Sequence, residues 1–463
     1  MADNKNITFA HWLRIFVMTQ PVLDILTYLS ITYWNLDITI GIVVRVLFMF
    51  ISLVYIIWGN RHLHKKTVIG YLFVLFAVIG VSFILNILTK PQFYFFSEVQ
   101  YVVKTIYFPV LLCTFYLVIT EKGRQIGSQF IFAVMIAMLI LSLSIFAAII
   151  TNTSNSTYTY AKSGYIGWFY AGNEISAIVA ITMPLVLVFA LQKTNQWKDI
   201  YYWFPALLLA ITGLLIGTKV SFFAVIGTMI LALLLNTINR IIRKLKSTSI
   251  LMINVLLLAL FLLFIPISPA YENIRGDYSK IQESQPEEVQ TNERELLDSG
   301  EMSEEKVEGD PFLQSRLVKV LLSSRNEYFA DIYMDFKNAG LLQKLFGLGY
   351  AGYYTDVPKL IEMDFFDLFF SYGIVGFFML LVPYVLVFWR VLMAAIKNFT
   401  FFIRTENVLL AISGGLGIGV AFLAGHVLYS PAVSIYLALV LVLLYTNNSD
   451  HILEERKKRG QEI

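Results

Sequence analysis

The sequence predicts an all-α membrane protein with about twelve transmembrane helices and one large polar loop between the ninth and the tenth. Of the 463 residues, 57% are hydrophobic and 14% are charged, and the mean hydropathy is +0.69. An average soluble domain carries roughly 25% charged residues. Apolar segments with the length of a bilayer-crossing helix, about 20 residues, recur along the chain. This pattern indicates an integral membrane protein.

Twelve apolar segments have the composition of membrane-spanning helices. They are residues 12–30, 38–58, 67–89, 99–119, 128–150, 173–191, 200–217, 219–236, 249–267, 365–389, 407–425 and 428–446. The last two are short and closely joined, so the pattern is compatible with eleven to thirteen helices. The first segment retains Arg14 and Asp24, and no small-residue cleavage site follows it. It is therefore interpreted as an uncleaved first helix.

Lys and Arg are concentrated in alternate short connections. These residues are Arg61, Lys65, Lys66, Lys122, Arg124, Lys193, Lys198, Arg240, Arg243, Lys244, Lys246, Arg390, Lys397 and Arg404, whereas the intervening connections hold Lys90, Lys162 and Lys219. Cytoplasmic loops of membrane proteins carry the excess of Lys and Arg. The asymmetry predicts that both termini, including the basic tail 447–463, are cytoplasmic.

Residues 269–364 form the large polar loop, which this orientation makes extracytoplasmic. It separates helices 1–9, within residues 1–268, from helices 10–12, within residues 365–446. Its first part, 269–311, is acidic and lacks aromatic residues from Gln282 onward, so we expect a mobile or loosely helical segment. In the second part, 312–364, apolar residues recur at helical spacing. We expect amphipathic helices there that lie against the membrane domain.

Five ionisable residues fall at a similar, outward depth in this topology: Asp24, Arg45, Lys104, Glu174 and Lys219. A lipid-facing charge in mid-membrane costs on the order of 3 kcal/mol, so a group of them indicates a shared hydrated cavity. The alternative for Lys104 and Glu174 is individual snorkelling near helix ends.

Three of these residues, Arg45, Lys104 and Lys219, are cations near the outer leaflet. Two loop residues, Arg316 and Arg325, add to them. Arg and Lys are the usual partners of phosphate. The predicted ligand is therefore an anionic head group, and a lipid-linked diphosphate is the obvious external substrate of this kind.

Several short motifs follow one another in a characteristic order. They are Gly172-Asn173-Glu174 at the start of a span, Gly217-Thr218-Lys219 in a turn, Ser323-Ser324-Arg325-Asn326, Leu345-Phe346-Gly347-Leu348-Gly349-Tyr350, and Glu362-Met363-Asp364-Phe365-Phe366-Asp367 followed by Tyr372-Gly373-Ile374-Val375-Gly376. In this order and at this placement around the loop, they resemble the O-antigen ligase and O-antigen polymerase superfamily. The resemblance is clearest over residues 170–445.

Two positions depart from the family pattern. Glu362 stands where the family has a His that is a candidate base, and Lys219 stands where an Arg is usual. The chain in this respect resembles the Gram-positive branch, which is associated with cell-surface polysaccharide or teichuronic-acid type polymers. A carboxylate can also take a proton from an acceptor hydroxyl. The alternative role of Glu362 and Asp364 is to cap the N-terminus of the tenth helix, where acidic residues are favoured.

The resemblance implies a GT-C-like glycosyltransferase of the bacterial plasma membrane that joins glycans on the outer face. Its donor would be an undecaprenyl-diphosphate-linked saccharide, and no metal or nucleotide cofactor is expected. The implied catalytic residues are Glu362, Asp364 and Arg325, and the implied diphosphate-binding residues are Lys219, Arg316, Arg325, Arg45 and Lys104. Whether the acceptor is another lipid-linked glycan, as in a polymerase, or a different carrier, as in a ligase, stays open.

The expected partners are a lipid-linked oligosaccharide, membrane lipid and other polysaccharide-assembly proteins, with no nucleic acid. Cys113 is the single cysteine, so a disulfide framework is not expected. Tyr350, Tyr353 and Tyr354 are suited to stacking on sugars, although an aromatic belt at the membrane interface also explains such residues. The alternative classes are a twelve-helix transporter or glycan flippase, for which we find no convincing internal repeat, and a non-catalytic scaffold.

The topology is directly testable at Ser299, in the acidic part of the loop. A cysteine introduced there should react with a membrane-impermeant maleimide in whole cells, because the Lys and Arg bias makes this loop extracytoplasmic. Protection of the cysteine until the cells are lysed would overturn the predicted orientation.

Overall fold

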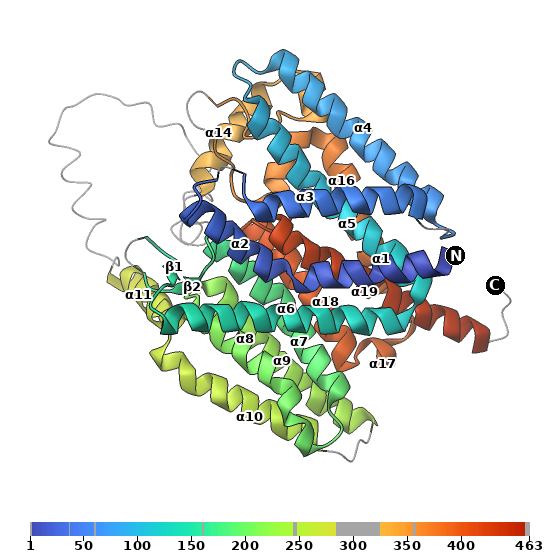
Figure 1. Ribbon diagram of the computed structural model, residues 1–463, viewed down its shortest axis with the longest axis vertical. Helices are drawn as coiled ribbons and strands as arrows, with labels where there is room; N and C mark the ends of the chain where they lie inside the picture. Colours follow the sequence, from blue (N-terminus) through green and yellow to red (C-terminus); the bar gives the residue numbers. More distant parts are fainter. Residues whose placement is uncertain are drawn as a thin grey trace.

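The computed structural model describes residues 2–36, 38–59, 62–159, 162–243, 248–283, 325–354 and 358–458. Over these ranges the chain is almost entirely helical (Figure 1). The described strands are short: β1 (Asn155–Ser156) pairs antiparallel with β2 (Tyr165–Gly167). The predicted all-α class is confirmed.

The helices begin and end as follows. They are α1 (Ala2–Met18), α2 (Gln20–Thr32), α3 (Ile40–Val54), α4 (Lys65–Thr89), α5 (Phe95–Lys122), α6 (Arg124–Ile150), α7 (Gly172–Lys193), α8 (Phe204–Leu215), α9 (Lys219–Arg243), α10 (Ser249–Phe264), α11 (Pro269–Glu283), α14 (Arg325–Asn338), α15 (Leu341–Phe346), α16 (Asp364–Lys397), α17 (Phe399–Phe402), α18 (Thr405–Leu423) and α19 (Pro431–Lys458), with short π or 3-10 turns at Tyr55–Gly59, Trp197–Trp203 and Ile265–Ile267.

Each of the twelve predicted segments contains a helix. Within the described residues, nine helices are long and apolar enough to cross a membrane. The pair Phe9–Met18 and Gln20–Thr32, which is bent by 56°, is either a tenth, broken span or a re-entrant loop. Pro21 at the start of α2 explains this break, because proline lacks the N–H that would continue the helical ladder. The other two segments are shorter: α8 has 12 residues, and the apolar part of α19 spans Pro431–Asn447.

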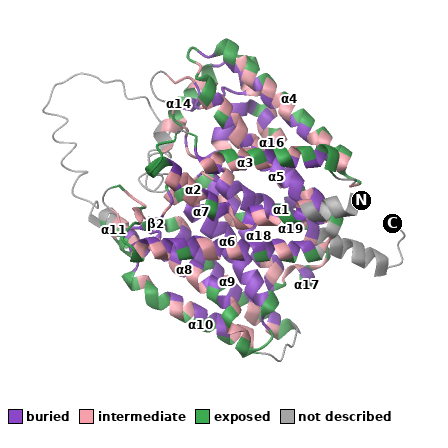
Figure 2. Cartoon of the chain, in the orientation of Figure 1, coloured by how far each residue is buried: buried purple, intermediate pink, exposed green. Residues whose placement is uncertain are grey.

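Helix α7 forms the centre of the bundle. In its most apolar stretch 94% of the residues are buried, against 28% in α4 and 22% in α10, which lie at the periphery (Figure 2). It packs against α18, α9 and α6. Gly417 permits one of these contacts, because a Cβ there would lie 2.8 Å from Leu437 of α19 and 3.1 Å from Ile181 of α7.

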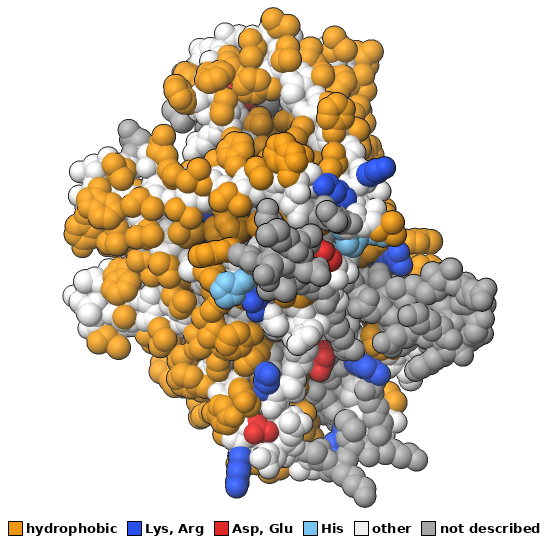
Figure 3. Space-filling view, turned by 45° about the vertical axis from the view of Figure 1, so that its right-hand side comes forward, with side chains coloured by type: hydrophobic (Ala, Val, Ile, Leu, Met, Phe, Trp, Pro, Cys, Tyr) orange, Lys and Arg blue, Asp and Glu red, His pale blue; other side chains and the backbone are white. Residues whose placement is uncertain are grey.

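The outer surface of the bundle suits a lipid environment. Hydrophobic side chains cover most of the upper and left-hand part of the face in Figure 3, and the charged side chains lie mainly at its centre, to the right of the centre and in its lower middle. Single apolar residues on a surface are normal, but contiguous apolar surface marks an interaction with membrane or protein. Together with the spans, this surface defines a multi-pass membrane protein.

The two chain ends lie away from the described parts of the large loop. The start of α1 and the end of α19 lie on the right in Figure 1, whereas α11, α14 and the β1–β2 hairpin lie on the left. The helices of the loop and the termini are therefore at opposite ends of the spans. Which end faces outward stays a prediction.

Helix α14 lies against the first turns of α16. Its buried Ile332 belongs to a small apolar cluster with Ile361, Met363 and Phe370. The ring of Phe329 also meets that of Phe370 edge-on, with centroids 5.7 Å apart. This contact positions Arg325, the first residue of α14. The predicted loop residues 284–324, which include most of the acidic segment, lie outside the described ranges.

Two of the motifs noted in the sequence interlock beside this helix. Helix α16 is broken at Gly373, whose φ is +64°. The segment that follows α15 packs against this break. Leu348 N donates to Phe370 O (2.8 Å), and Gly349 N donates to Ser371 O (3.0 Å). A Cβ on Gly347 would lie 2.2 Å from Ser371 O. The glycines are therefore required by close backbone approach.

Candidate functional site

The start of α16 is tied to the turn between α18 and α19 by one carboxylate. Asp364 is fully buried, and its Oδ2 accepts hydrogen bonds from the backbone N–H of Val427 (2.8 Å) and of Leu428 (2.7 Å). Hydrogen bonds to an ionised acceptor are about twice as strong as neutral ones. This contact brings residues 424–430 against residues 361–364.

Asp367, one turn further along α16, closes the preceding turn. Its Oδ1 accepts from Ile361 N (2.9 Å) and its Oδ2 accepts from Met363 N (3.1 Å). The side chain is 2% exposed. Both aspartates of the Glu-Met-Asp-Phe-Phe-Asp motif therefore bind backbone N–H groups, Asp367 those of the turn before α16 and Asp364 those of the turn between α18 and α19. Asp364 therefore joins two elements and does not cap α16, in contrast to the alternative role predicted for it.

The backbone at this junction adopts left-handed conformations. Glu362 has φ +64°, His426 has φ +61° and Gly425 has φ +67°. A Cβ on Gly425 would lie 2.3 Å from Glu362 O, so only glycine fits there. For a non-glycine residue such a conformation costs on the order of 1–3 kcal/mol, and residues of this kind cluster at functional sites.

Glu362, Arg325 and His426 meet where three elements converge. Arg325 Nη2 lies 3.5 Å from Glu362 Oε2, and His426 Nε2 lies 3.7 Å from the same oxygen. Arg325 Nη2 also donates to Ala424 O at 3.2 Å. The Glu362 side chain is 37% exposed and that of Arg325 is 12% exposed. These three residues, called the loop-end cluster below, place a carboxylate, an imidazole and a guanidinium within reach of one ligand.

The charges of this cluster stabilise one another. The contact with His426 lowers the pKa of Glu362 against the opposing effect of burial, and the charges of Arg325 and Lys359 lower it further. Burial alone would lower the pKa of His426, but Glu362 and the nearby Glu174 and Asp364 outweigh it, so its pKa is raised. Glu362 is therefore ionised at neutral pH, and His426 holds its proton to a higher pH than a free histidine.

A second polar group lies inside the bundle beneath the cluster. Arg45 is 5% exposed and donates to Asp24 Oδ1 (2.7 Å) and Gln20 Oε1 (2.9 Å). Glu174, in the first turn of α7, interacts electrostatically with Arg45 and His426. Lys104 interacts with the same Glu174. The structure thus brings Arg45, Lys104, Glu174 and Asp24 together, as their predicted depth suggested.

Lys219 belongs to a different group. Its Nζ lies 3.0 Å from Asp277 Oδ2 on α11, and Lys162 Nζ lies 2.8 Å from the same oxygen. Despite partial burial, hydrogen bonds from both lysines lower the pKa of Asp277. No hydrogen bond or ion pair between described residues joins this group to the loop-end cluster. Arg316 lies outside the described residues.

His426 was not singled out by the sequence analysis. It lies in the short gap between the segments predicted at 407–425 and 428–446, and it is one of five histidines in the chain. An ionisable residue between two tightly joined spans was the available signal. Its proximity to Glu362 arises only from the fold.

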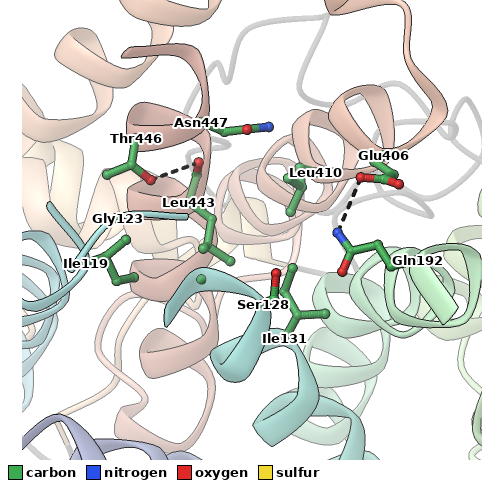
Figure 4. Close-up of a pocket in the computed structure, with 11 residues that line it drawn as sticks. Ile119, Gly123, Ser128, Ile131, Gln192, Glu406, Leu410, Leu443, Thr446 and Asn447 are labelled. Atoms are coloured by element: carbon green, nitrogen blue, oxygen red, sulfur yellow. Dashed lines mark hydrogen bonds between the residues drawn. The ribbon is translucent and has the colours of Figure 1, made fainter. Parts of the chain in front are cut away.

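A small pocket with mixed polar and apolar lining lies at the other end of the helices. It measures about 50 Å³ and is lined by residues of α5, α6, α7, α18 and α19 and the Gly123 turn (Figure 4). Gln192 Nε2 donates to Glu406 Oε2 at 3.3 Å there. Among its described lining residues, Glu406 is the ionisable one, so this pocket suits an anionic head group poorly. Over the described residues, no group of three His, Cys, Asp or Glu side chains could hold a metal ion.

Fold and site together define a multi-pass membrane protein with a charged cluster where its large loop meets the bundle. The family model described as "O-antigen ligase like membrane protein" matches residues 5–449. The chain therefore belongs to this family, as the sequence motifs predicted. A comparison with curated proteins gives no match. The family consists of membrane proteins that ligate or polymerise glycans in polysaccharide assembly, acting on lipid-linked glycans.

The role of Asp364 can be separated from that of Glu362 by stability. Asp364→Ala leaves two buried backbone N–H groups without an acceptor, which costs about 1–3 kcal/mol for each group. The purified protein should therefore unfold at a distinctly lower temperature, whereas Glu362→Gln should unfold close to wild type. Equal unfolding temperatures for Asp364→Ala and wild type would contradict the anchoring role.

Proposed function

We propose that the protein transfers a saccharide from an undecaprenyl-diphosphate-linked donor to a glycan hydroxyl on the outer face of the bacterial plasma membrane. The observation that carries this proposal is the loop-end cluster, in which Arg325, Glu362 and His426 meet at the boundary of loop and bundle. Arg suits a diphosphate and a carboxylate suits an acceptor hydroxyl. Both polymerisation and ligation use this chemistry.

Arg325 is the best-placed ligand for the leaving diphosphate. Its Nε is buried and has no hydrogen-bond partner within the described part of the chain, while its Nη2 contacts a half-buried carboxylate and a carbonyl. The contact of Nη2 with Glu362 is long at 3.5 Å, so an incoming phosphate can replace it. Arg45 and Lys219 already pair with Asp24 and Asp277. We therefore assign these two cations a supporting role, in which their charges contribute to the local electrostatic potential.

Glu362 is the better candidate for the base of the two predicted carboxylates. It is 37% exposed, whereas Asp364 is fully buried and uses one oxygen for two backbone N–H groups. Only an accessible carboxylate can reach a substrate hydroxyl within hydrogen-bond distance. Because its pKa is lowered, Glu362 is ionised and can accept a proton, although it binds that proton weakly. His426 lies beside it, with Nε2 3.7 Å from Glu362 Oε2.

The proposed transfer needs no reactant other than the lipid-linked donor and the acceptor hydroxyl. The acceptor oxygen gives its proton to Glu362 and forms a bond to the anomeric carbon of the donor sugar. The bond from that carbon to the diphosphate oxygen breaks, and its electron pair leaves with the lipid diphosphate. The negative charge that grows on this oxygen is stabilised by Arg325.

Arg325 variants test the diphosphate role. Arg325→Ala should lower the transfer rate roughly a hundredfold or more, since removing a donor to a developing charge costs about 3 kcal/mol. Arg325→Lys should restore only part of it, because an ammonium lacks the two-pronged geometry. The assay is transfer by purified protein from a lipid-diphosphate-linked donor. Lys337→Ala, an exposed residue of the same helix, serves as the control and should be near normal.

The same transfer assay tests whether Glu362 is the general base. Glu362→Gln keeps the size of the side chain but cannot accept a proton, so a base role predicts a severe loss of rate. Asp331→Asn, an exposed carboxylate on α14, is the matched control. Full activity in both Glu362→Gln and Asp364→Asn would reject a carboxylate base in this loop.

A further inference from the structure

A buried ion pair fixes the segment after α15 to the connection between α4 and α5. Lys90 and Glu98 form the pair, and their side chains are 0% and 3% exposed. Lys90 Nζ also donates to Tyr350 O (2.7 Å), and Glu98 Oε2 accepts from Tyr350 N (2.8 Å). The backbone C=O and N–H of Tyr350 are thus both bound by the Lys90–Glu98 pair. Breaking such a pair costs about 3–5 kcal/mol, so the segment has a fixed position.

Two tyrosines stack above this anchor. Lys90 Nζ lies 4.9 Å from the ring centroid of Tyr354. That ring stacks on Tyr94, with centroids 5.2 Å apart and an interplanar angle of 22°, and Tyr94 N donates to Tyr354 OH at 3.2 Å. Tyr94 is 46% exposed, and its hydroxyl reaches Gln92 Oε1 at 3.4 Å. The stack presents an aromatic face and an amide to the surroundings.

A row of aromatic rings leads from this stack to the loop-end cluster. Tyr350, the anchored residue, meets Tyr101 with centroids 5.3 Å apart. Tyr101 meets Tyr429 at 6.0 Å, and Tyr429 meets the ring of His426 at 6.1 Å. The stack therefore lies on the same side of the bundle as Glu362 and Arg325, and packed side chains connect them.

We propose that Tyr94, backed by Tyr354 and flanked by Gln92, is a binding subsite for the glycan part of a lipid-linked substrate. Sugar rings have apolar C–H faces that stack on aromatic rings, and their hydroxyls pair with amide and phenol groups. The subsite rests on the proposed function, because it holds the chain whose reacting end lies at the loop-end cluster. Lys90 and Glu98 are positioning residues for it.

The membrane interface alone does not account for this arrangement. Phe96 is an aromatic residue of the same connection and is 87% exposed, as an interface residue can be. Tyr94 differs in that its ring has a defined partner, and that partner is fixed to a buried ion pair. An interfacial ring needs no such support, whereas preorganisation of a binding surface raises affinity.

The test uses full-length protein in nanodiscs and, as the probe, oligosaccharide repeating units released by partial hydrolysis of surface polysaccharide from the producing cells. Wild type should bind this lipid-free probe, and Tyr94→Ala should bind it roughly tenfold or more weakly. Tyr94→Phe keeps the ring and should lose only a few-fold. Phe96→Ala is the matched control and should bind like wild type. Equal unfolding temperatures verify that the variants are folded.

Three results would overturn the proposal. They are no binding of the probe by wild type, unchanged binding by Tyr94→Ala, and an equal loss in Phe96→Ala. A KM-against-kcat measurement tests the positioning role, since Glu98→Gln should raise the KM for the glycan acceptor with little change in kcat. A fall in kcat alone would contradict it.

The outcome is distinguishable from a failure of the proposed function. Arg325→Ala should bind the lipid-free oligosaccharide within about twofold of wild type, because the probe carries no diphosphate. If Arg325→Ala retained full transfer while Tyr94→Ala lost the probe, the proposed chemistry would fail and the glycan subsite would stand.

Discussion

The hydrogen bonds from Val427 and Leu428 to Asp364 are the contact on which the site depends. They join the start of α16 to the turn between α18 and α19, and α16, α17 and α18 lie between the two along the chain. Because that turn also carries His426, the same contact sets the distance from His426 to Glu362. Buried backbone donors must be satisfied, so the junction has one geometry rather than several. Glu362 thus lies close to His426 because Asp364, two positions further along the chain, holds the turn that carries His426.

The cations of the chain differ in how far their charges are already neutralised. Arg45 is buried and bonded to Asp24, and Lys219 shares Asp277 with Lys162. Separating the buried Arg45–Asp24 pair costs several kcal/mol. The Lys219 side chain is 44% exposed, so its pairing is weaker. Arg325, in contrast, faces a carboxylate at 3.5 Å that is itself 37% exposed. An incoming diphosphate can displace this long contact, and Arg325 lies beside the candidate base Glu362, which is why the proposed chemistry is centred on α14.

Much of the fold follows from the sequence, but the composition of the site follows only in part. Hydropathy located each of the nine candidate spans among the described residues, because the bilayer sets the length of an apolar helix. The depth of charged residues grouped Arg45, Lys104 and Glu174 correctly. It also placed Lys219 with them, although Asp277 on α11 holds it elsewhere. His426 and Tyr94 were not found, because their partners come from distant segments that no local pattern connects.

The central claim is that donor and acceptor meet at the loop-end cluster. A cryo-EM structure of the full-length protein with an unreactive lipid-diphosphate-linked saccharide tests it most directly. The account predicts the diphosphate within hydrogen-bond distance of Arg325 and the anomeric carbon on the side of Glu362. A diphosphate bound away from Arg325, whether at the Lys162 and Lys219 pair alone or in the pocket beside Glu406, would contradict the account.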